Sequence, residues 1–238
     1  MWRLYLGLIA LTIIVLDAVL ALQSPPTSNT PTRAPTGEGV GSARHLVEVA
    51  DSSLELSVNW RFVVDERLFR ELVARIESHS RGYPDLHPDD VRVLELLKED
   101  PRIIAILEVN VTLANMGPES VYVLCGGGYV GLLRSKLMEI LNQHDSGPSC
   151  TYVLVEPVKG EVARGFMMEP LSLVVRKLEP GGSIGNLFYF VIKKPSPEEP
   201  FIAKLHVETV SICKVYDVDC ERGVTSKRLE ATVDIKFG

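Results

Sequence analysis

The sequence lacks the residue patterns on which most metal and catalytic sites are built. Its four cysteines form no Cys-x-x-Cys pair, and its five histidines are scattered without the spacing of metal ligands. No Gly-x-Ser-x-Gly nucleophile motif is present, since Ser183 lies in a Gly-Gly-Ser-Ile-Gly run. We therefore expect neither a metal nor a cofactor, and we predict that the chain is not an enzyme.

Positive charge and glutamine are also scarce. The chain has 25 Lys and Arg against 31 Asp and Glu, a formal net charge of −6. An acidic protein is poorly suited to the phosphate backbone of nucleic acid, which we exclude as a partner. Glutamine occurs only at Gln23 and Gln143, while Val, Leu, Ile, Arg and Glu are abundant. That composition is typical of hyperthermophile proteins.

Long apolar runs are absent except at the N-terminus. Arg3 precedes an apolar stretch over residues 4–22, and about 20 such residues suffice to cross a bilayer. Asp17 weakens a membrane anchor without excluding it. We expect residues 1–23 to form a helical signal anchor, with Arg3 on the cytoplasmic side and the rest outside. Cleavage near Ala21, which would release a secreted protein, is the alternative.

A Pro/Ser/Thr-rich segment follows this apolar run. Residues 24–43 hold four prolines and seven Ser or Thr, too few apolar side chains to offset the entropy of ordering. We interpret the segment as an extended stalk. Residues 44–238 then form one extracytoplasmic domain, which is long enough for a hydrophobic core of its own.

The cysteines point to disulfide bonds. Four cysteines are an even number in an exported chain, which favours two disulfides, and three pairings are open. If the strands that flank Cys125 and Cys150 are antiparallel neighbours, the two Cα atoms lie within the roughly 7 Å limit for a disulfide. In a parallel β-α-β unit they lie at opposite edges. The disulfide candidates are Cys125, Cys150, Cys213 and Cys220.

The periodicity of the domain is mainly that of strands. Residues 54–63 alternate apolar and polar side chains, as a half-buried strand does. Residues 65–99 predict two amphipathic helices, the second with Pro88 at its first position. Residues 129–144 predict another helix. The remaining expected strands are 103–114, 121–124, 152–155, 171–176, 187–193, 201–216 and 229–237, and we expect the first two of these to form a hairpin.

Two of the predicted turns carry a resemblance to a known family. Asn115-Met-Gly117, between the strands 103–114 and 121–124, and Pro180-Gly181, before an alternating strand, resemble the turns of immunoglobulin-like domains in prokaryotic cell-surface proteins, archaeal ones in particular. The resemblance covers about 40 residues. It implies a two-sheet antiparallel sandwich used for surface display or adhesion, and it brings no catalytic residues.

A glycine-rich motif suggests an alternative. Gly126, Gly128 and Gly131 form a Gly-x-Gly-x-x-Gly motif between a predicted strand and a predicted helix, and Glu156 ends the next strand. This resembles the dinucleotide fingerprint, in which the glycines admit the pyrophosphate and the acid binds a ribose hydroxyl. No further strand-helix units follow Glu156, so we favour a glycine-rich loop and a helical excursion.

Together these patterns predict a mainly β protein. We expect an antiparallel immunoglobulin-like β-sandwich with a helical hairpin at about 65–99 and a helical excursion at about 129–144. Asn110-Val-Thr112 is a candidate glycosylation site. The expected function is a non-catalytic structural or binding module with a protein partner at the cell surface. The alternatives are a nucleotide-binding protein and a ligand-sensing ectodomain with a groove between the helical hairpin and the sheet.

Overall fold

The structure is a computed structural model of the chain, which divides into two compact units, residues 1–33 and 34–238. The predicted anchor, the cleavage position near Ala21 and nearly all of the predicted stalk lie outside the described residues. The described residues, all in the second unit, are 40–49, 52–82, 86–127, 131–143, 149–165, 172–209, 211–222 and 225–238.

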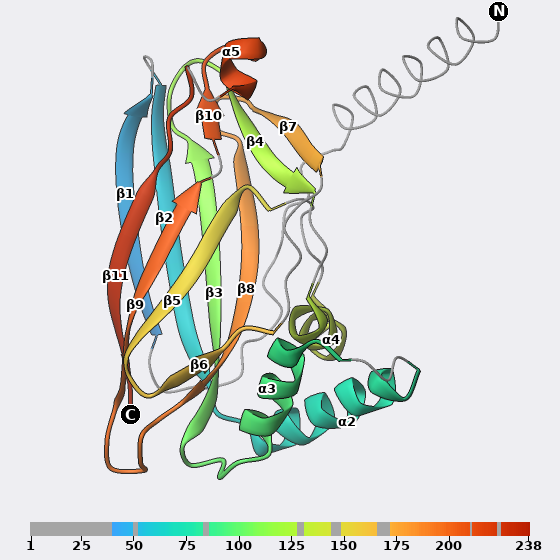
Figure 1. The fold of residues 1–238 in the computed structure, drawn as a ribbon. Helices are drawn as coiled ribbons and strands as arrows, with labels where there is room; N and C mark the ends of the chain where they lie inside the picture. Colours follow the sequence, from blue (N-terminus) through green and yellow to red (C-terminus); the bar gives the residue numbers. More distant parts are fainter. Residues whose placement is uncertain are drawn as a thin grey trace, which may run out of the picture. The chain divides into compact units, whose positions relative to one another are not determined.

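Three antiparallel sheets form the described domain (Figure 1). The largest has the strand order β1-β2-β3-β8-β6, and the two smaller sheets have the orders β10-β4-β7 and β11-β9-β5. The strands are β1 (Val40–Val49), β2 (Ser52–Val63), β3 (Ile104–Asn115), β4 (Val121–Gly127), β5 (Thr151–Lys159), β6 (Glu161–Ala163), β7 (Ser172–Leu178), β8 (Ser183–Lys193), β9 (Phe201–Thr209), β10 (Ser211–Cys213) and β11 (Glu230–Phe237).

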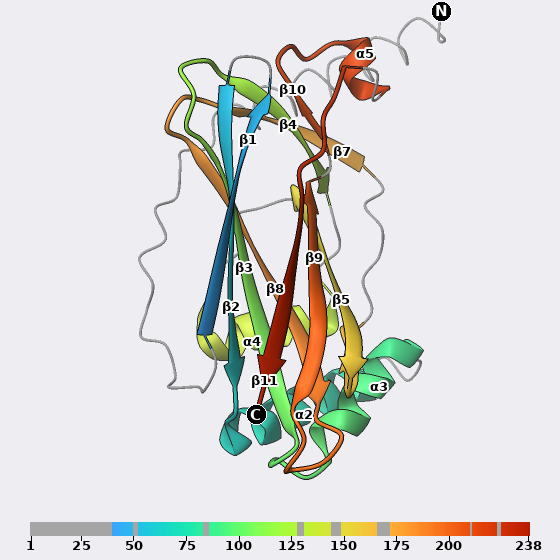
Figure 2. The same ribbon diagram turned by 90° about the vertical axis from the view of Figure 1, so that its left-hand side faces the viewer.

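The strands pack as two layers, which Figure 2 shows edge on. On β2, every second side chain from Leu54 to Val58 is fully buried, because successive side chains of a strand point to opposite faces. Leu107 of β3, Phe190 of β8 and Leu205 of β9 join the same hydrophobic cluster. This shared core between the large sheet and the smaller sheets makes the domain an antiparallel β-sandwich, as predicted.

Three longer helices cover part of the outer face of the large sheet. They are α2 (Glu66–Gly82), α3 (Pro88–Leu97) and α4 (Leu132–Leu141); the fourth, α5 (Val218–Glu221), is one turn long. Buried side chains of the three longer helices form a second hydrophobic cluster with Ile106 of β3 and Val191 of β8. The predicted hairpin and helical excursion are therefore confirmed.

The two turns that carried the resemblance lie side by side. The Asn115 side chain donates to the carbonyl oxygens of Glu119 at 2.7 Å and Leu178 at 3.0 Å, and accepts from the Gly117 N–H at 3.0 Å. The Gly181 N–H donates to the Asn115 carbonyl at 2.8 Å, and Gly181 has a φ of +74°, which suits glycine. Each turn carries the chain between the large sheet and the β10-β4-β7 sheet.

Three sequence predictions need correction. Strands 103–114 and 121–124 form no hairpin, since β3 pairs with β2 and β8 while β4 pairs with β7 and β10. The stretch 201–216 is not one strand, because β9 ends at Thr209 and β10 ends at Cys213. Finally, β1 begins at Val40, inside the range assigned to the stalk, and pairs along its whole length with β2.

Candidate functional site

Two disulfides are present, as the sequence predicted. Cys125 is bonded to Cys150 and Cys213 to Cys220, with Cα–Cα distances of 4.0 Å and 6.0 Å. All four residues are buried, and no cysteine of the described residues is free. The first bond joins β4 to the residue before β5, and the second closes a loop between β10 and α5.

The glycine-rich motif is not part of a parallel β-α-β unit. Its first strand, β4, and the strand after the helix, β5, belong to different sheets, and they approach each other through an antiparallel bridge between Gly126 and Ser149. Gly131 precedes α4, and Gly128 lies outside the described residues. Glu156 is exposed on β5. The nucleotide interpretation thus loses the geometry on which it depended.

Asn110 lies in the middle of β3 and is exposed to solvent. It faces away from the core, between Asn59 of β2 and Leu187 of β8 in register. Its side chain is therefore accessible, and glycosylation of Asn110 stays a prediction.

A hydroxyl, an imidazole and a carboxylate line up on the outer face of the β11-β9-β5 sheet. His206 Nδ1 lies 3.1 Å from Thr232 Oγ1, and His206 Nε2 lies 3.0 Å from Glu156 Oε2. The order resembles that of a nucleophile relay, but a relay needs oxyanion donors and a site that excludes water. Because these side chains stand on a solvent-facing sheet surface, we interpret them as a cross-strand hydrogen-bond row.

A buried polar cluster lies beneath α4 on the outer face of the large sheet. Arg61 Nη2 of β2 donates to Glu108 Oε2 of β3 at 2.7 Å, and both side chains are largely buried. The Tyr189 hydroxyl of β8 donates to Gln143, just after α4. Burial raises the pKa of Tyr189 above its ordinary value, and the charge of Glu108 adds to that effect. Tyr189 is therefore a neutral donor at any physiological pH.

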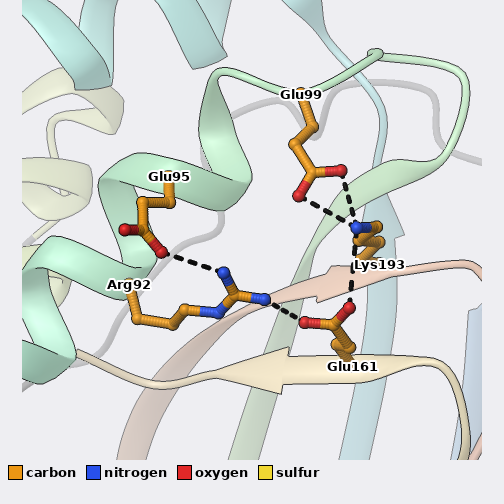
Figure 3. Close-up of polar contacts among 5 residues, drawn as sticks. All are labelled: Arg92, Glu95, Glu99, Glu161 and Lys193. Carbon is orange, nitrogen blue, oxygen red and sulfur yellow. Dashed lines mark hydrogen bonds and ion pairs between the residues drawn. The ribbon is translucent and has the colours of Figure 1, made fainter.

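An ionic network joins α3 to the sheet (Figure 3). Lys193 Nζ of β8 lies 2.7 Å from Glu99 and 3.5 Å from Glu161 of β6, and Arg92 of α3 binds Glu95 at 2.9 Å and also Glu161. Burial raises the pKa of Glu161, but the Arg92 hydrogen bond and the Lys193 charge outweigh it and lower the pKa overall. Every carboxylate has a cationic partner, so the network is a structural clamp between helix and sheet.

The Cys213–Cys220 disulfide closes a loop with an apolar, exposed surface. We call residues 213–221 the tip loop. Val215, Tyr216 and Val218 are 60%, 41% and 58% exposed. A contiguous exposed apolar patch can serve as an interaction site, so we take the tip loop as the candidate site.

The conformation of the tip loop is held from several sides. The Tyr216 ring lies 6.2 Å from that of Tyr122 on β4, and the Tyr216 hydroxyl donates to Glu221. That hydrogen bond, together with burial, raises the pKa of Tyr216. Lys214 binds Glu119 of the β3–β4 turn at 2.9 Å, and the Asp217 side chain accepts the Cys220 N–H at 2.8 Å. The apolar side chains are thus presented on a rigid support.

A shallow pocket of about 340 Å³ lies between α2 and the end of α3. The space between the helical hairpin and the sheet, where a groove was expected, is instead filled by buried side chains such as Leu72, Leu96 and Ile104. The residues that line the pocket are Glu66, Phe69, Arg70, Val73, Leu97, Lys98, Glu99 and Pro101.

The sequence pointed to the cysteines of the tip loop but not to its apolar residues. Val215, Tyr216 and Val218 form too short a run for their periodicity to distinguish an exposed loop from a strand. The even cysteine count and the seven-residue spacing of Cys213 and Cys220 were the available signal, because a short disulfide loop has to project from the strand that precedes it.

No protein-family model and no curated protein matches the chain. Among solved structures, it is similar to the ApaA protein from Bordetella pertussis, at 11% identity and a TM-score of 0.34, over 79% of this chain and 96% of that one. It is also similar to the GAE domain of yeast GGA1, at 10% identity and a TM-score of 0.26, over 81% and 98%. At such TM-scores these likenesses carry no inference about the chain.

None of the helices in the described residues is both long and apolar enough to cross a membrane. In the same part of the chain, no three His, Cys, Asp or Glu side chains are grouped to hold a metal ion.

Proposed function

We propose that the chain is a non-catalytic binding module at the cell surface, which engages a protein partner through the tip loop. The sequence further supports an immunoglobulin-like domain of an archaeal, thermophilic surface protein, tethered by residues 4–22 or released by cleavage near Ala21. The two disulfides support an oxidising compartment, since such bonds persist outside the cytoplasm.

The observation that carries this proposal is the rigid, apolar tip loop. Tyrosine is enriched among the residues that dominate binding energy, because it buries a large area at little conformational cost. Tyr216 is already fixed by its contacts with Tyr122 and Glu221. A side chain that is ordered before binding loses less entropy on binding, which raises affinity.

Site-specific photo-crosslinking in intact cells tests the proposal. A photoreactive residue is placed at position 216 and, as a matched control, at position 152. Tyr152 is also an exposed aromatic residue, at 44%, but it lies on β5 outside the tip loop. We expect a discrete adduct at 216 and none at 152, and we expect removal of both Cys213 and Cys220 to abolish it.

The location of the domain outside the membrane is tested in the same cells with a membrane-impermeant lysine reagent. Exposed lysines of the domain, such as Lys204 and Lys236, should react before lysis if the domain lies outside. Labelling only after lysis, or equal adducts at positions 216 and 152, would contradict the proposal.

A ligand-sensing role is the second candidate. The pocket between α2 and α3 favours it, because its volume of about 340 Å³ is within the range of small-molecule sites. A ligand bound there should protect α2 and α3 from amide hydrogen exchange while leaving the tip loop unchanged.

A further inference from the structure

We infer that the partner of the tip loop is a second copy of this chain, whose pocket between α2 and α3 receives Tyr216, so that copies associate head to tail. This inference rests on the proposed function and names its partner. It joins the exposed tip loop of one copy to the pocket of the next.

The pocket has the composition that a tyrosine and its acidic surroundings require. Its floor is apolar, formed by Phe69, Val73 and Leu97, and its volume of about 340 Å³ accommodates one aromatic side chain. Two cations stand at its rim, Arg70 with 77% and Lys98 with 53% of the side chain exposed. Such an apolar centre with a charged rim is the usual anatomy of a protein interface.

The rim cations are available for new partners. Arg70 lies 3.9 Å from Glu66, a pair in which both side chains are exposed. Lys98 binds Glu77 at 2.6 Å, again with both side chains half exposed. Exposed pairs of this kind contribute little, about 0 to 1 kcal/mol, so exchange of one carboxylate for another costs little. The carboxylate of Glu99 in the pocket is already bound to Lys193 at 2.7 Å.

The tip loop supplies the complementary charge. It carries three exposed carboxylates, on Asp217, Asp219 and Glu221, and its one cation, Lys214, is bound to Glu119. The tip carboxylates of one copy can replace Glu66 and Glu77 as the partners of Arg70 and Lys98 on the next copy. Lys98 and Arg70 would flank the apolar pocket as the tip carboxylates flank Tyr216.

The tip loop and the pocket lie at opposite ends of the β2 strand, so a chain cannot fill its own pocket (Figure 1). Ser52 at the start of β2 donates to the Glu119 carbonyl at 3.1 Å, and Glu119 binds Lys214 of the tip loop. At the other end, Val63 is followed within three residues by Glu66 of the pocket. At about 3.3 Å per residue, the strand between them spans roughly 40 Å.

Charge and backbone geometry disfavour the other ways to cover the tip loop. Two tip loops in contact would bring six carboxylates together, and an anionic lipid surface would repel the same groups. Edge-to-edge pairing of two β5 strands is hindered by Pro157 and by the irregularity between Pro157 and Lys159. A contact between unlike surfaces leaves one surface of each copy free, so copies add one after another, in an open row or a closed ring.

Sedimentation velocity of the full chain in detergent tests the inference. Because a tip-sized contact is small, we expect association in the range of roughly 10 µM to 1 mM. Tyr216→Ala and the double variant Arg70→Glu/Lys98→Glu should each weaken it at least tenfold. Tyr152→Ala, a matched loss of an exposed aromatic side chain, should associate as the unmodified chain does.

The decisive sample is an equimolar mixture of the two weakened variants. Each retains one intact surface, so the mixture should form dimers that do not grow further, while each variant alone stays monomeric. A chain that stays monomeric to about 1 mM, variants that associate normally, or a mixture without dimers would overturn the inference. A photo-adduct at position 216 with a different protein would then leave the proposed function standing, whereas no adduct at all would remove both.

Discussion

The two disulfides of this domain stand in contrasting surroundings. Cys125 and Cys150 belong to the main hydrophobic core, and their bond links β4 to the strand that enters the β11-β9-β5 sheet. Cys213 and Cys220 share only a small cluster with Leu124, and their bond closes a loop of exposed side chains. The first bond secures the sandwich, and the second gives a surface loop a fixed conformation.

Under the proposed function, this contrast separates stability from recognition within one chain. The core disulfide closes a stretch of 25 residues and the tip disulfide a stretch of seven. The loop-closure entropy removed from the unfolded chain grows with the length of the closed loop. Loss of the core bond should therefore affect mainly unfolding, and loss of the tip bond mainly binding.

The largest expected effect comes from the core bond. The variant Cys125→Ala/Cys150→Ala should lower the free energy of unfolding by about 3 kcal/mol, the size expected for a loop of this length. Urea denaturation measured by circular dichroism checks this value. A loss below about 1 kcal/mol would show that the two bonds do not differ as described.

The tip bond should give a smaller loss of stability and a larger loss of binding. For Cys213→Ala/Cys220→Ala we expect about 2 kcal/mol of destabilisation, because the closed loop is short. The photo-adduct at position 216 should be lost, since the side chain at that position is no longer held beside Tyr122. An unchanged adduct would mean that the bond does not organise the loop.

Asn186 should affect the stability of the region around the core disulfide and not binding at the tip loop. Its buried side chain on β8 accepts the Cys150 N–H at 3.0 Å, so it joins the large sheet to the segment that carries the core disulfide. Asn186→Ala leaves that N–H without its acceptor and should cost about 1 to 3 kcal/mol, again measured by urea denaturation.

Asn110→Ala on β3 is the matched control for Asn186, since its side chain is exposed. It should change stability by less than about 0.5 kcal/mol. Mass spectrometry of the same pair of proteins tests the predicted glycosylation at Asn110. Equal losses for the two variants would contradict the role given to Asn186.

The smallest effect concerns the ionic clamp on α3, which lies outside both disulfide regions. The folded-state pKa of Glu161 is below its ordinary value of 4.5, so the carboxylate stabilises the fold above that pH. The contribution is lost as the pH falls through the folded pKa. Because Glu161 is about half exposed, we expect at most about 0.5 kcal/mol.

Thermal unfolding of Glu161→Gln at pH 7 and at pH 3 checks this sign. The variant should be slightly less stable than the unmodified chain at pH 7, and the two should converge at pH 3. A difference that grows toward low pH would contradict the lowered pKa. Binding at the tip loop should be unchanged at either pH.

Local sequence patterns predicted most elements of the fold. Alternation in residues 54–63, the apolar stripe of α2 and the proline at the start of α3 are each properties of one segment, and each gave the correct element. The turns at Asn115 and at Pro180-Gly181 were each predicted from the sequence. The contact between these two turns was not.

Pairing between distant segments could not be predicted in the same way. A strand such as β4 carries no mark that assigns it to one sheet rather than another, so its long-range pairing with β7 was missed. The first four residues of β1 were taken for stalk because they follow a polar run, and the order of this strand comes from pairing with β2. The pocket and the tip loop likewise depend on side chains that only the fold brings together.

Peptide mapping without reduction, on the chain isolated from its native cells with free thiols alkylated, shows whether the tip loop is closed in the native protein. We expect two linked pairs, Cys125 with Cys150 and Cys213 with Cys220, and no alkylated cysteine. Alkylated Cys213 and Cys220 would mean that the tip loop is open in the native protein, and would contradict its role as a rigid binding surface.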